Sequence, residues 1–455
     1  MRMHHLLKGS IAYSVAKERE DNVLHQLQYC NAQASFFSHL KRNIAGIRRI
    51  VSHHLCLESP ERCHVAGPDE WIHGSFNICI LVTVDGYSHK DQPGSRVMMR
   101  FPLPCRVGEA FSPRNGDEKF THIDQLTVFT KYIHKLRRYC VFQTNSCDIG
   151  VGYILIKYIE KSQGIMFSNT WLENNSSAEL RANLFRGLSK ILLSLDRIPL
   201  PRIGSFIINK NGYLRLENRP LTMKIQMLEN EEIPTDISRD VTYSTVESYT
   251  ANLLHIHDNR LQRQPNVVND EDDCGIQMGT LAAMRALHHG PFIFSLTDLH
   301  QSNILVDQNW NITCLVDLEW ACSRPIEMIE TPYWLTGKGV DQINADKYNI
   351  PRCELMDILA SQEAPNTDRA IPRLSEVLAN TWASGKFWVT LAPSIPSALF
   401  TIFAKHIYPQ FSSHGNPGHG ALPFLWAKDA PRFVNKKVDE KVYDEKLQLA
   451  FEDPA

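Results

Sequence analysis

The stretch SLTDLHQSNILVDQNWNITCLVD, residues 295–317, decides the fold, because it combines a polar loop with a short predicted hairpin. Asp298 lies five residues before Asn303 (303 − 298 = 5), and Asp317 lies 14 residues after Asn303 (317 − 303 = 14). Two apolar runs, joined by the polar turn DQNWN, separate Asn303 from Asp317. An antiparallel hairpin returns the chain to the end where it began. We therefore expect Asn303 and Asp317 to lie together, with Asp298 on the loop that leads in.

These three side chains suit phosphoryl transfer. Mg²⁺ prefers oxygen ligands and usually takes one or two carboxylates beside phosphates and water, and Asn303 and Asp317 can supply such oxygens. A carboxylate that does not bind the metal can orient an acceptor hydroxyl and receive its proton, and Asp298 has the right place for this. An Asp and an Asn at this spacing also occur as ordinary turn residues, since both bond to their own backbone. The ordered set of loop, hairpin and second Asp favours a kinase-type site.

The composition is that of a large globular protein. At 455 residues the chain exceeds the usual size of a single hydrophobic core, which predicts one bilobal protein or two domains. Its hydrophobic fraction of 43% and charged fraction of 22% are ordinary for soluble domains. The 48 basic and 50 acidic residues nearly cancel, so the charge gives no reason to expect nucleic-acid or membrane binding.

The cysteines and the N-terminus indicate a cytoplasmic protein. The chain has 11 cysteines, an odd number, and none forms a CxxC pair, which argues against a zinc cluster or a disulfide framework and favours a reducing compartment. The N-terminal stretch MRMHHLLKGSIAYSVAKERED has no apolar core long enough for a signal peptide. No stretch approaches the roughly 20 apolar residues that cross a bilayer.

The sequence divides into three predicted parts. Residues 1–66 form an N-terminal helical extension, residues 67–160 form an N-lobe with a nucleotide-binding β-sheet and an irregular helix region, and residues 161–455 form a helical C-lobe with the catalytic loop at 295–320. Within the extension, apolar residues recur at roughly helical spacing over about 16–57, which predicts two helices.

Shorter patterns predict individual elements. The β-rich runs 78–84 and 96–101 flank a turn rich in Asp, Gly and Pro, and with a third run at 152–160 they predict a small antiparallel sheet. In the C-lobe, residues 177–195 place leucines on one helical face, and the Pro-containing RIPLPRIG ends that helix. Residues 245–287 are predicted to be largely helical, with a polar interruption.

The motif residues resemble a known family. The loop with Asp298 and Asn303 is similar to the H-x-D-x-x-x-x-N loop of aminoglycoside phosphotransferases, and DLEWA is similar to their metal-binding segment. SLTDLHQSNILVD, ITCLVDLEWACSRPIEM and PYWLTG, with RFPLP and YILIKYIE, resemble a filamentous-fungal group of that superfamily. The resemblance runs from Trp71 to Trp426 and is densest around the loop. It implies an α+β, bilobal protein-kinase-like fold, with nucleotide held between a small β-rich N-lobe and a large helical C-lobe.

The resemblance also implies roles for single residues. Asp298 matches the catalytic base, and Asn303 and Asp317 match the ligands of Mg²⁺. The positions that match nucleotide-binding residues are Gly74 and Ser75 in the loop over the phosphates, Arg100 at the place of the usual phosphate-binding Lys, and Lys157 and Ile159 in the hinge beside adenine. The implied reaction transfers a phosphoryl group from ATP to a hydroxyl of an unidentified small molecule.

The sequence departs from the family pattern at three points. Leu296 replaces the first His of the H-x-D loop, and Arg100 replaces a Lys, keeping the charge but not its compact geometry. Kinases pair this cation with a Glu on the next helix, and neither Glu118 nor Asp124 stands at the expected position. This third departure leaves two alternatives open: a pseudokinase that binds nucleotide or a partner without turnover, or a damaged version of an active relative.

Two further residues near the motif have two interpretations each. His300 could contact substrate or phosphate, or it could be a loop-packing imidazole that is hydrogen-bonded locally. Glu319 could support the metal-binding residues, or it could begin a helix or pack in the core. We therefore treat both as accessory candidates.

Overall fold

The structure is a computed structural model. It describes residues 3–86, 96–109, 111–113, 115, 118, 149–208, 213–284, 292–363, 373–410, 422–439 and 441–452.

An antiparallel sheet dominates the N-terminal part, as the β-rich runs predict. Its strands, in sheet order, are β3 (Cys63–Val65), β5 (Asn77–Val84), β6 (Arg96–Pro102) and β7 (Ile154–Lys157), and β4 (Ile72–His73) also pairs with β5. Buried side chains alternate with half-buried ones along β5, because successive side chains of a strand point to opposite faces. Arg100 pairs in register with Cys79 of β5, and its own strand, β6, lies between β5 and β7. Arg100 therefore lies on a central strand.

Helices from the predicted N-terminal extension complete this core. The helices of the region are α1 (Tyr13–Glu18), α2 (Val23–Leu27), α3 (Tyr29–Arg42) and α4 (Ile44–His54). Apolar residues of α3 and α4, including Leu40 and Ile47, share one buried cluster with strand residues such as Ile80 and Met99. The first strand of the sheet, β3, also falls within 1–66. The extension and the sheet therefore form one packing unit.

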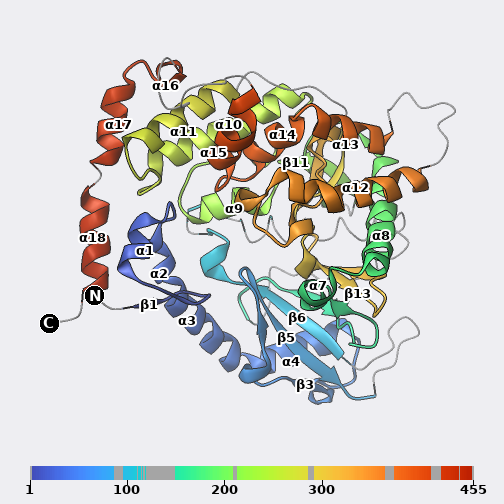
Figure 1. The fold of residues 1–455 in the computed structure, drawn as a ribbon. Coiled ribbons are helices and arrows are strands. Elements are labelled where there is room, and N and C mark those ends of the chain that lie inside the picture. Colours follow the sequence, from blue (N-terminus) through green and yellow to red (C-terminus); the bar gives the residue numbers. More distant parts are fainter. Residues whose placement is uncertain are drawn as a thin grey trace.

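The C-terminal part is mainly helical (Figure 1). Its helices are α7 (Ser168–Asn174), α8 (Ala178–Asp196), α9 (Met223–Asn230), α10 (Val246–Arg263), α11 (Glu271–Met284), α12 (Ala345–Gln362), α13 (Leu374–Ala383), α14 (Lys386–Ser394), α15 (Leu399–Ile402), α16 (Leu422–Trp426), α17 (Ala430–Val438) and α18 (Lys441–Phe451). The predicted helix over 177–195 is confirmed as α8, and Ser177 caps it by accepting a hydrogen bond from the backbone N–H of Leu180.

Short strands frame the predicted catalytic loop. The strands are β8 (Ile165–Met166), β9 (Pro199–Leu200), β12 (Phe292–Leu296), β13 (Ile304–Val306), β14 (Ile312–Leu315) and β15 (Ala321–Pro325), with a separate hairpin of β10 (Ser205–Ile208) and β11 (Leu214–Asn218). β13 pairs with β14, which confirms the predicted hairpin, and β12 lies between β9 and β15. The loop therefore leaves one small sheet and enters another, and both its ends are anchored.

The order of elements is that of a bilobal kinase-like fold, with a strand-rich N-terminal region followed by a helical C-terminal region. The end of the chain returns to its start: α18 packs against α1 and α2, and Val23 donates its backbone N–H to the Tyr443 hydroxyl at 2.9 Å (Figure 1). Among the described residues, no helix combines the length and apolar character needed to cross a membrane.

Candidate active site

The predicted catalytic loop holds Asp298 and Asn303 against each other. Between them the chain makes a single 3₁₀ turn, Gln301–Asn303. The side-chain amide of Asn303 donates to the backbone carbonyl of Asp298 at 2.8 Å and to its carboxylate at 3.1 Å. The backbone carbonyl of Asn303 accepts a hydrogen bond from the N–H of Val316 at 2.9 Å, which ties the loop to the end of the hairpin. The hairpin therefore brings Asn303, at the end of the loop, next to the residue before Asp317.

Asp317 lies at the end of the hairpin in a left-handed backbone conformation, with φ of 56°. Such a conformation is uncommon for a residue other than glycine and occurs often at functional sites. Its carboxylate forms an ion pair of 2.8 Å with the guanidinium of Arg100, yet the Asp317 side chain stays 43% exposed. One face of the carboxylate thus remains accessible while the other is held by a cation.

Arg100 reaches this site from β6 and has a second partner, Glu319. The distance from Arg100 Nη2 to Glu319 Oε1 is 2.8 Å, and the Glu319 side chain is only 2% exposed. Burial acts to lower the pKa of Arg100, but the Asp317 and Glu319 carboxylates outweigh burial and the net shift is upward. Arg100 is therefore a permanent cation that joins a strand of the N-terminal sheet to the segment after the hairpin.

The electrostatic environment of Asp298 differs from that of an exposed carboxylate. Burial raises its pKa to about 7, and the negative charges of Glu319 and Asp317 add to the effect. The hydrogen bond from Asn303 and the charge of Lys224 act in the opposite direction. A carboxylate with a pKa near neutrality can exchange protons at physiological pH, which is the property that a general base requires.

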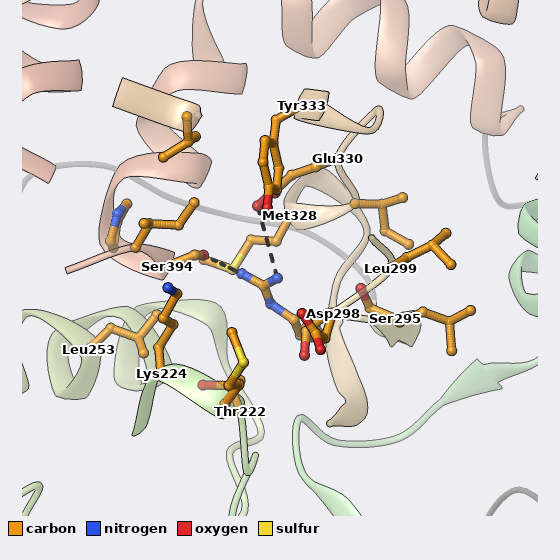
Figure 2. A pocket seen from close by; sticks show the side chains of 18 of the residues that line it. Thr222, Lys224, Leu253, Ser295, Asp298, Leu299, Met328, Glu330, Tyr333 and Ser394 are labelled. Atoms are coloured by element: carbon orange, nitrogen blue, oxygen red, sulfur yellow. Dashed lines mark hydrogen bonds and ion pairs between the residues drawn. The ribbon is translucent and has the colours of Figure 1, made fainter. Parts of the chain in front are cut away.

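Asp298 opens onto a cavity of about 350 Å³. Figure 2 shows Asp298 and Lys224 projecting into this pocket from different elements, the loop after β12 and helix α9. Burial lowers the pKa of Lys224, and the charge of Asp298 opposes that shift. The volume lies in the range of small-molecule sites, so the cavity can hold an acceptor whose hydroxyl meets Asp298.

The other predicted residues of the phosphate loop lie near the same segment. The backbone N–H of Gly74 bonds to the carbonyl of Asn77 at 3.0 Å, and no atom lies within 4 Å of where a Cβ on Gly74 would be. Arg106 donates to the backbone carbonyl of Ser75 at 3.1 Å. The next residue, Phe76, contacts the ring of Trp320 edge-on, with centroids 6.1 Å apart. The loop thus contacts the segment that follows Asp317 and Glu319.

The predicted hinge residues follow the edge strand of the sheet. Lys157 ends β7, and Ile159 lies in the connection toward β8. Arg96 of β6 stacks on the ring of Tyr158 at 4.4 Å and forms an ion pair with Glu160. These contacts fix the connection on both sides of Ile159.

His300 and Leu296 have local contacts. The His300 imidazole accepts the backbone N–H of Ser302 at 3.4 Å and thereby caps the 3₁₀ turn, while burial lowers its pKa. His300 also lines the cavity, so the structure is compatible with both interpretations of this residue. Leu296 ends β12, pairs in register with Ala321 and packs on the core of the helical part.

Glu118, one of the two acidic residues considered as partners of Arg100, lies in a different cluster. Its carboxylate pairs with Arg219 at 2.8 Å and with Arg239 at 3.0 Å. Arg219 also pairs with Glu229 at 2.6 Å. Asp124 lies outside the described residues. The carboxylates that act on Arg100 are instead Asp317 and Glu319, and neither of them belongs to the segment after β6.

Lys224 and the Arg219 cluster were missed from the sequence. Lys224, and Arg219 and Glu229 of the cluster, belong to the segment between β10 and α10, in which no motif or clear periodicity singles out a site. The one available signal was the cation Lys224 inside the run LTMKIQML, whose other members are mostly apolar.

The donor set near the hairpin fits Mg²⁺. Asn303 and Asp317 supply hard oxygen atoms, and the exposed part of the Asp317 carboxylate leaves room for a cation with bound water and phosphate. Over the part of the chain that the structure describes, no group of three or more His, Cys, Asp and Glu residues could hold a metal ion.

The solved structures that are similar to this chain include an ethanolamine kinase and a macrolide phosphotransferase. Plasmodium vivax ethanolamine kinase is 12% identical, with a TM-score of 0.37, and the match covers 83% of this chain and 85% of the other. A macrolide 2′-phosphotransferase type I is 14% identical, with a TM-score of 0.35, and the match covers 78% of this chain and 96% of the other. No family model and no curated protein matches.

Proposed function

We propose that this protein is an ATP- and Mg²⁺-dependent phosphotransferase that acts on a hydroxyl group of a small molecule. The observation that carries the proposal is the position of Asp298. It is bonded to Asn303, lies close enough to Asp317 and Glu319 for their charges to raise its pKa, and opens onto a cavity of about 350 Å³. A base, two candidate metal ligands and space for an acceptor therefore meet in one region.

Each residue has a role in this proposal. Asp298 receives the proton of the acceptor hydroxyl as that oxygen attacks the terminal phosphorus of ATP, and the bond from this phosphorus to the bridging oxygen breaks, so that ADP leaves. Asn303 and Asp317 would hold Mg²⁺, which would neutralise charge on the triphosphate. Gly74 and Ser75 lie over the phosphates, and the backbone near Lys157 and Ile159 faces the adenine.

Glu319 supplies the contact that kinases usually obtain from a helix. A phosphate-binding cation must be held in one orientation, and an acidic partner on the following helix normally holds it. Here the buried Glu319 carboxylate contacts both terminal nitrogens of Arg100, at 2.8 and 3.4 Å. Glu118, which is committed to Arg219, is not required for this purpose. In our proposal, the missing Glu on the helix after β6 is thus compatible with activity, because Glu319 takes its place beside Arg100.

The test is the release of ADP in the presence of Mg·ATP and a library of hydroxyl compounds. We expect ADP release that depends on both Mg²⁺ and one class of compound, and we expect Asp298→Asn to slow it by at least ~10²-fold, the scale of general-base catalysis. Asp240→Asn makes the same chemical change at an exposed position outside the cavity and should leave the rate unchanged.

Other outcomes would select an alternative. Mg²⁺-dependent ATP binding without transfer to any compound would favour a pseudokinase. This alternative draws on the Arg100–Asp317 ion pair, which occupies part of the carboxylate that a metal would need. No nucleotide binding at all would contradict both functions.

A further inference from the structure

Lys224 brings an ammonium group into the cavity beside Asp298. It lines the cavity, and Figure 2 shows its side chain projecting into the space from α9. The residue is half-buried, and its side chain forms no ion pair or hydrogen bond with any residue that the structure describes. A charged group that is withdrawn from water without a partner is destabilised. A ligand of opposite charge would therefore be bound favourably at this position.

The other charged side chains of the cavity have partners or are exposed. Arg324 lies 4.0 Å from Glu330, so these two charges compensate each other. The Asp298 carboxylate is hydrogen-bonded within its own loop, and Asp341 is exposed. Of the lining residues that the structure describes, Lys224 is therefore the cation that no carboxylate neutralises by direct contact.

The helix that carries Lys224 presents its positive end to the same space. Lys224 is the second residue of α9, and the N-cap residue Thr222 lines the cavity with it. The first turn of α9 contains no acidic residue. Because the helix dipole disfavours a cation at this end, Lys224 does not stabilise α9. The helix end and the ammonium group therefore both favour an anion in the cavity.

The walls of the cavity are mostly apolar. Side chains from α8, α10, β12 and the segments near α14 form them, among them Leu195, Leu253, Phe294, Met328 and Ile395. Removing apolar surface from water stabilises a complex, so such walls favour an apolar ligand body. The ligand should therefore confine its charge to one group at Lys224.

We infer that Lys224 is an anion-binding residue of the acceptor site and that the acceptor is a hydroxy acid with an apolar body. Its carboxylate lies at Lys224 and the first turn of α9, and its hydroxyl lies at Asp298. Only the place of the hydroxyl rests on the proposed function, since binding of the carboxylate needs no phosphoryl transfer. A carboxylate matches one cation, whereas a phosphate ester brings a charge of about −1.5 to −2.

An acceptor with an amine fits the cavity less well. Its ammonium group would need a carboxylate, but Glu330 lies beside Arg324 and Asp298 faces the reacting hydroxyl. An ion pair with the exposed Asp341 would be screened by water and salt. Lys224 would add repulsion between like charges. The charge pattern therefore favours acids over amines.

The test is binding without nucleotide, measured by calorimetry on the full chain. The probes are aliphatic and aromatic hydroxy acids, together with the primary amide and the primary amine that correspond to each acid. We expect an acid to bind at least about tenfold more tightly than its amide and its amine, the change that a hydrogen bond between charged groups produces. Tighter binding of the amides or amines, equal binding of all three, or no binding of any acid would overturn the inference.

Substitutions of Lys224 locate the carboxylate. Lys224→Met removes the charge but keeps an apolar side chain, so acid and amide should then bind within about threefold of each other, whereas Lys224→Arg should retain the preference for the acid. Lys224→Gln serves the same purpose if the methionine variant does not fold. Lys190→Met is the matched control, because Lys190 is exposed on α8 and does not line the cavity. A preference for the acid that survives in Lys224→Met would contradict the assignment.

The terminal phosphate of ATP is the other anion that could reach Lys224. If it did, Lys224→Met would weaken the binding of Mg·ATP and leave the binding of the hydroxy acids unchanged, which would contradict the inference. We expect the reverse: the affinity for Mg·ATP changes by less than about threefold, and the affinity for the acid falls at least about tenfold.

The binding and turnover experiments fail in different ways. If the acids bind as expected but no ADP is released with Mg·ATP, the proposed phosphotransferase activity is wrong and the carboxylate site stands. If ADP is released with hydroxyl compounds that have no carboxylate, and the acids do not bind, the activity stands and the acceptor class is wrong.

Discussion

Among the described residues, two buried arginines each lie between two carboxylates. Arg100 lies between Asp317 and Glu319, and Arg219 lies between Glu118 and Glu229. In both clusters the carboxylates outweigh burial and raise the pKa of the arginine. The distances from each arginine to its two carboxylates are similar, at 2.6–2.8 Å, although the Arg219 cluster also contains a second cation, Arg239, beside Glu118.

The clusters differ in the exposure of their carboxylates. Both acidic partners of Arg219 are only 3% exposed, and the Glu229 carboxylate also accepts a hydrogen bond from the hydroxyl of Thr235 at 2.7 Å. In the Arg100 cluster one partner is 2% exposed and the other, Asp317, is 43% exposed. A closed cluster can only stabilise the fold, whereas an open one has a carboxylate that can bind a ligand. The exposure of one carboxylate thus separates a structural cluster from a candidate active site.

Arg219→Met should produce the largest effect on stability. The change leaves Glu118 and Glu229 buried, and removing one partner from such a cluster typically costs about 3–5 kcal/mol. Urea denaturation measures the loss in the free energy of unfolding. Arg215→Met, on the exposed side of β11, is the control and should change stability by less than about 0.5 kcal/mol. Equal losses in the two variants would show that the buried cluster has no special role.

Glu319→Gln should have an intermediate effect. Glutamine can still accept a hydrogen bond from Arg100 but lacks the charge, so we expect a loss of about 1–3 kcal/mol in the free energy of unfolding. Because Arg100 then loses its buried anchor, the affinity for Mg·ATP should also fall. A variant that keeps full ATP affinity would contradict the role of Glu319 as the partner that orients Arg100.

The raised pKa of Asp298 predicts a pH dependence in the unliganded protein. The folded state holds the proton up to a pH of about 7, whereas the ordinary value for the unfolded chain is 3.8, so stability falls as the pH rises from about 4 to about 7. Asp298→Asn cannot titrate and should show a shallower fall in melting temperature over that window. Identical slopes in the two proteins would contradict the shift. In the free enzyme, kcat/KM should rise with pH through about 7, because the base must be deprotonated.

Asp317→Asn should have the smallest effect on stability. Its carboxylate is substantially exposed, and ion pairs with an exposed partner typically contribute less than about 1 kcal/mol. Urea denaturation of Asp317→Asn and Glu319→Gln, measured in parallel, compares the loss in the free energy of unfolding for the two carboxylates of this cluster. A larger loss in the free energy of unfolding for Asp317→Asn than for Glu319→Gln would contradict the assignment of Glu319 as the structural partner of Arg100 and of Asp317 as the partner available to a ligand.

The features that could be predicted from the sequence are those formed by residues close together along the chain. The hairpin of β13 and β14 follows from two apolar runs around a polar turn, and the contact between Asp298 and Asn303 spans only five residues. These features form locally, so periodicity and turn chemistry are sufficient to identify them.

Contacts between distant segments could not be predicted in this way. Arg100 and Glu319 are 219 residues apart, and Glu118 and Arg219 are 101 residues apart. Which acidic residue meets which arginine depends on how the two lobes pack, and the spacing of residues along the chain contains no information about that. Lys224 was missed for the same reason, because α9 is brought to the cavity by tertiary contacts.

The most direct test of the central claim is calorimetric titration of the wild-type protein and of Asp317→Asn with ATP, each with and without Mg²⁺. The account predicts that the wild type binds ATP at least about tenfold more tightly with Mg²⁺ than without it, and that Asp317→Asn abolishes this difference while remaining folded. Binding of ATP that is unaffected by Mg²⁺ or by the substitution, or no binding to the folded wild type, would contradict the assignment of this region as a nucleotide and metal site.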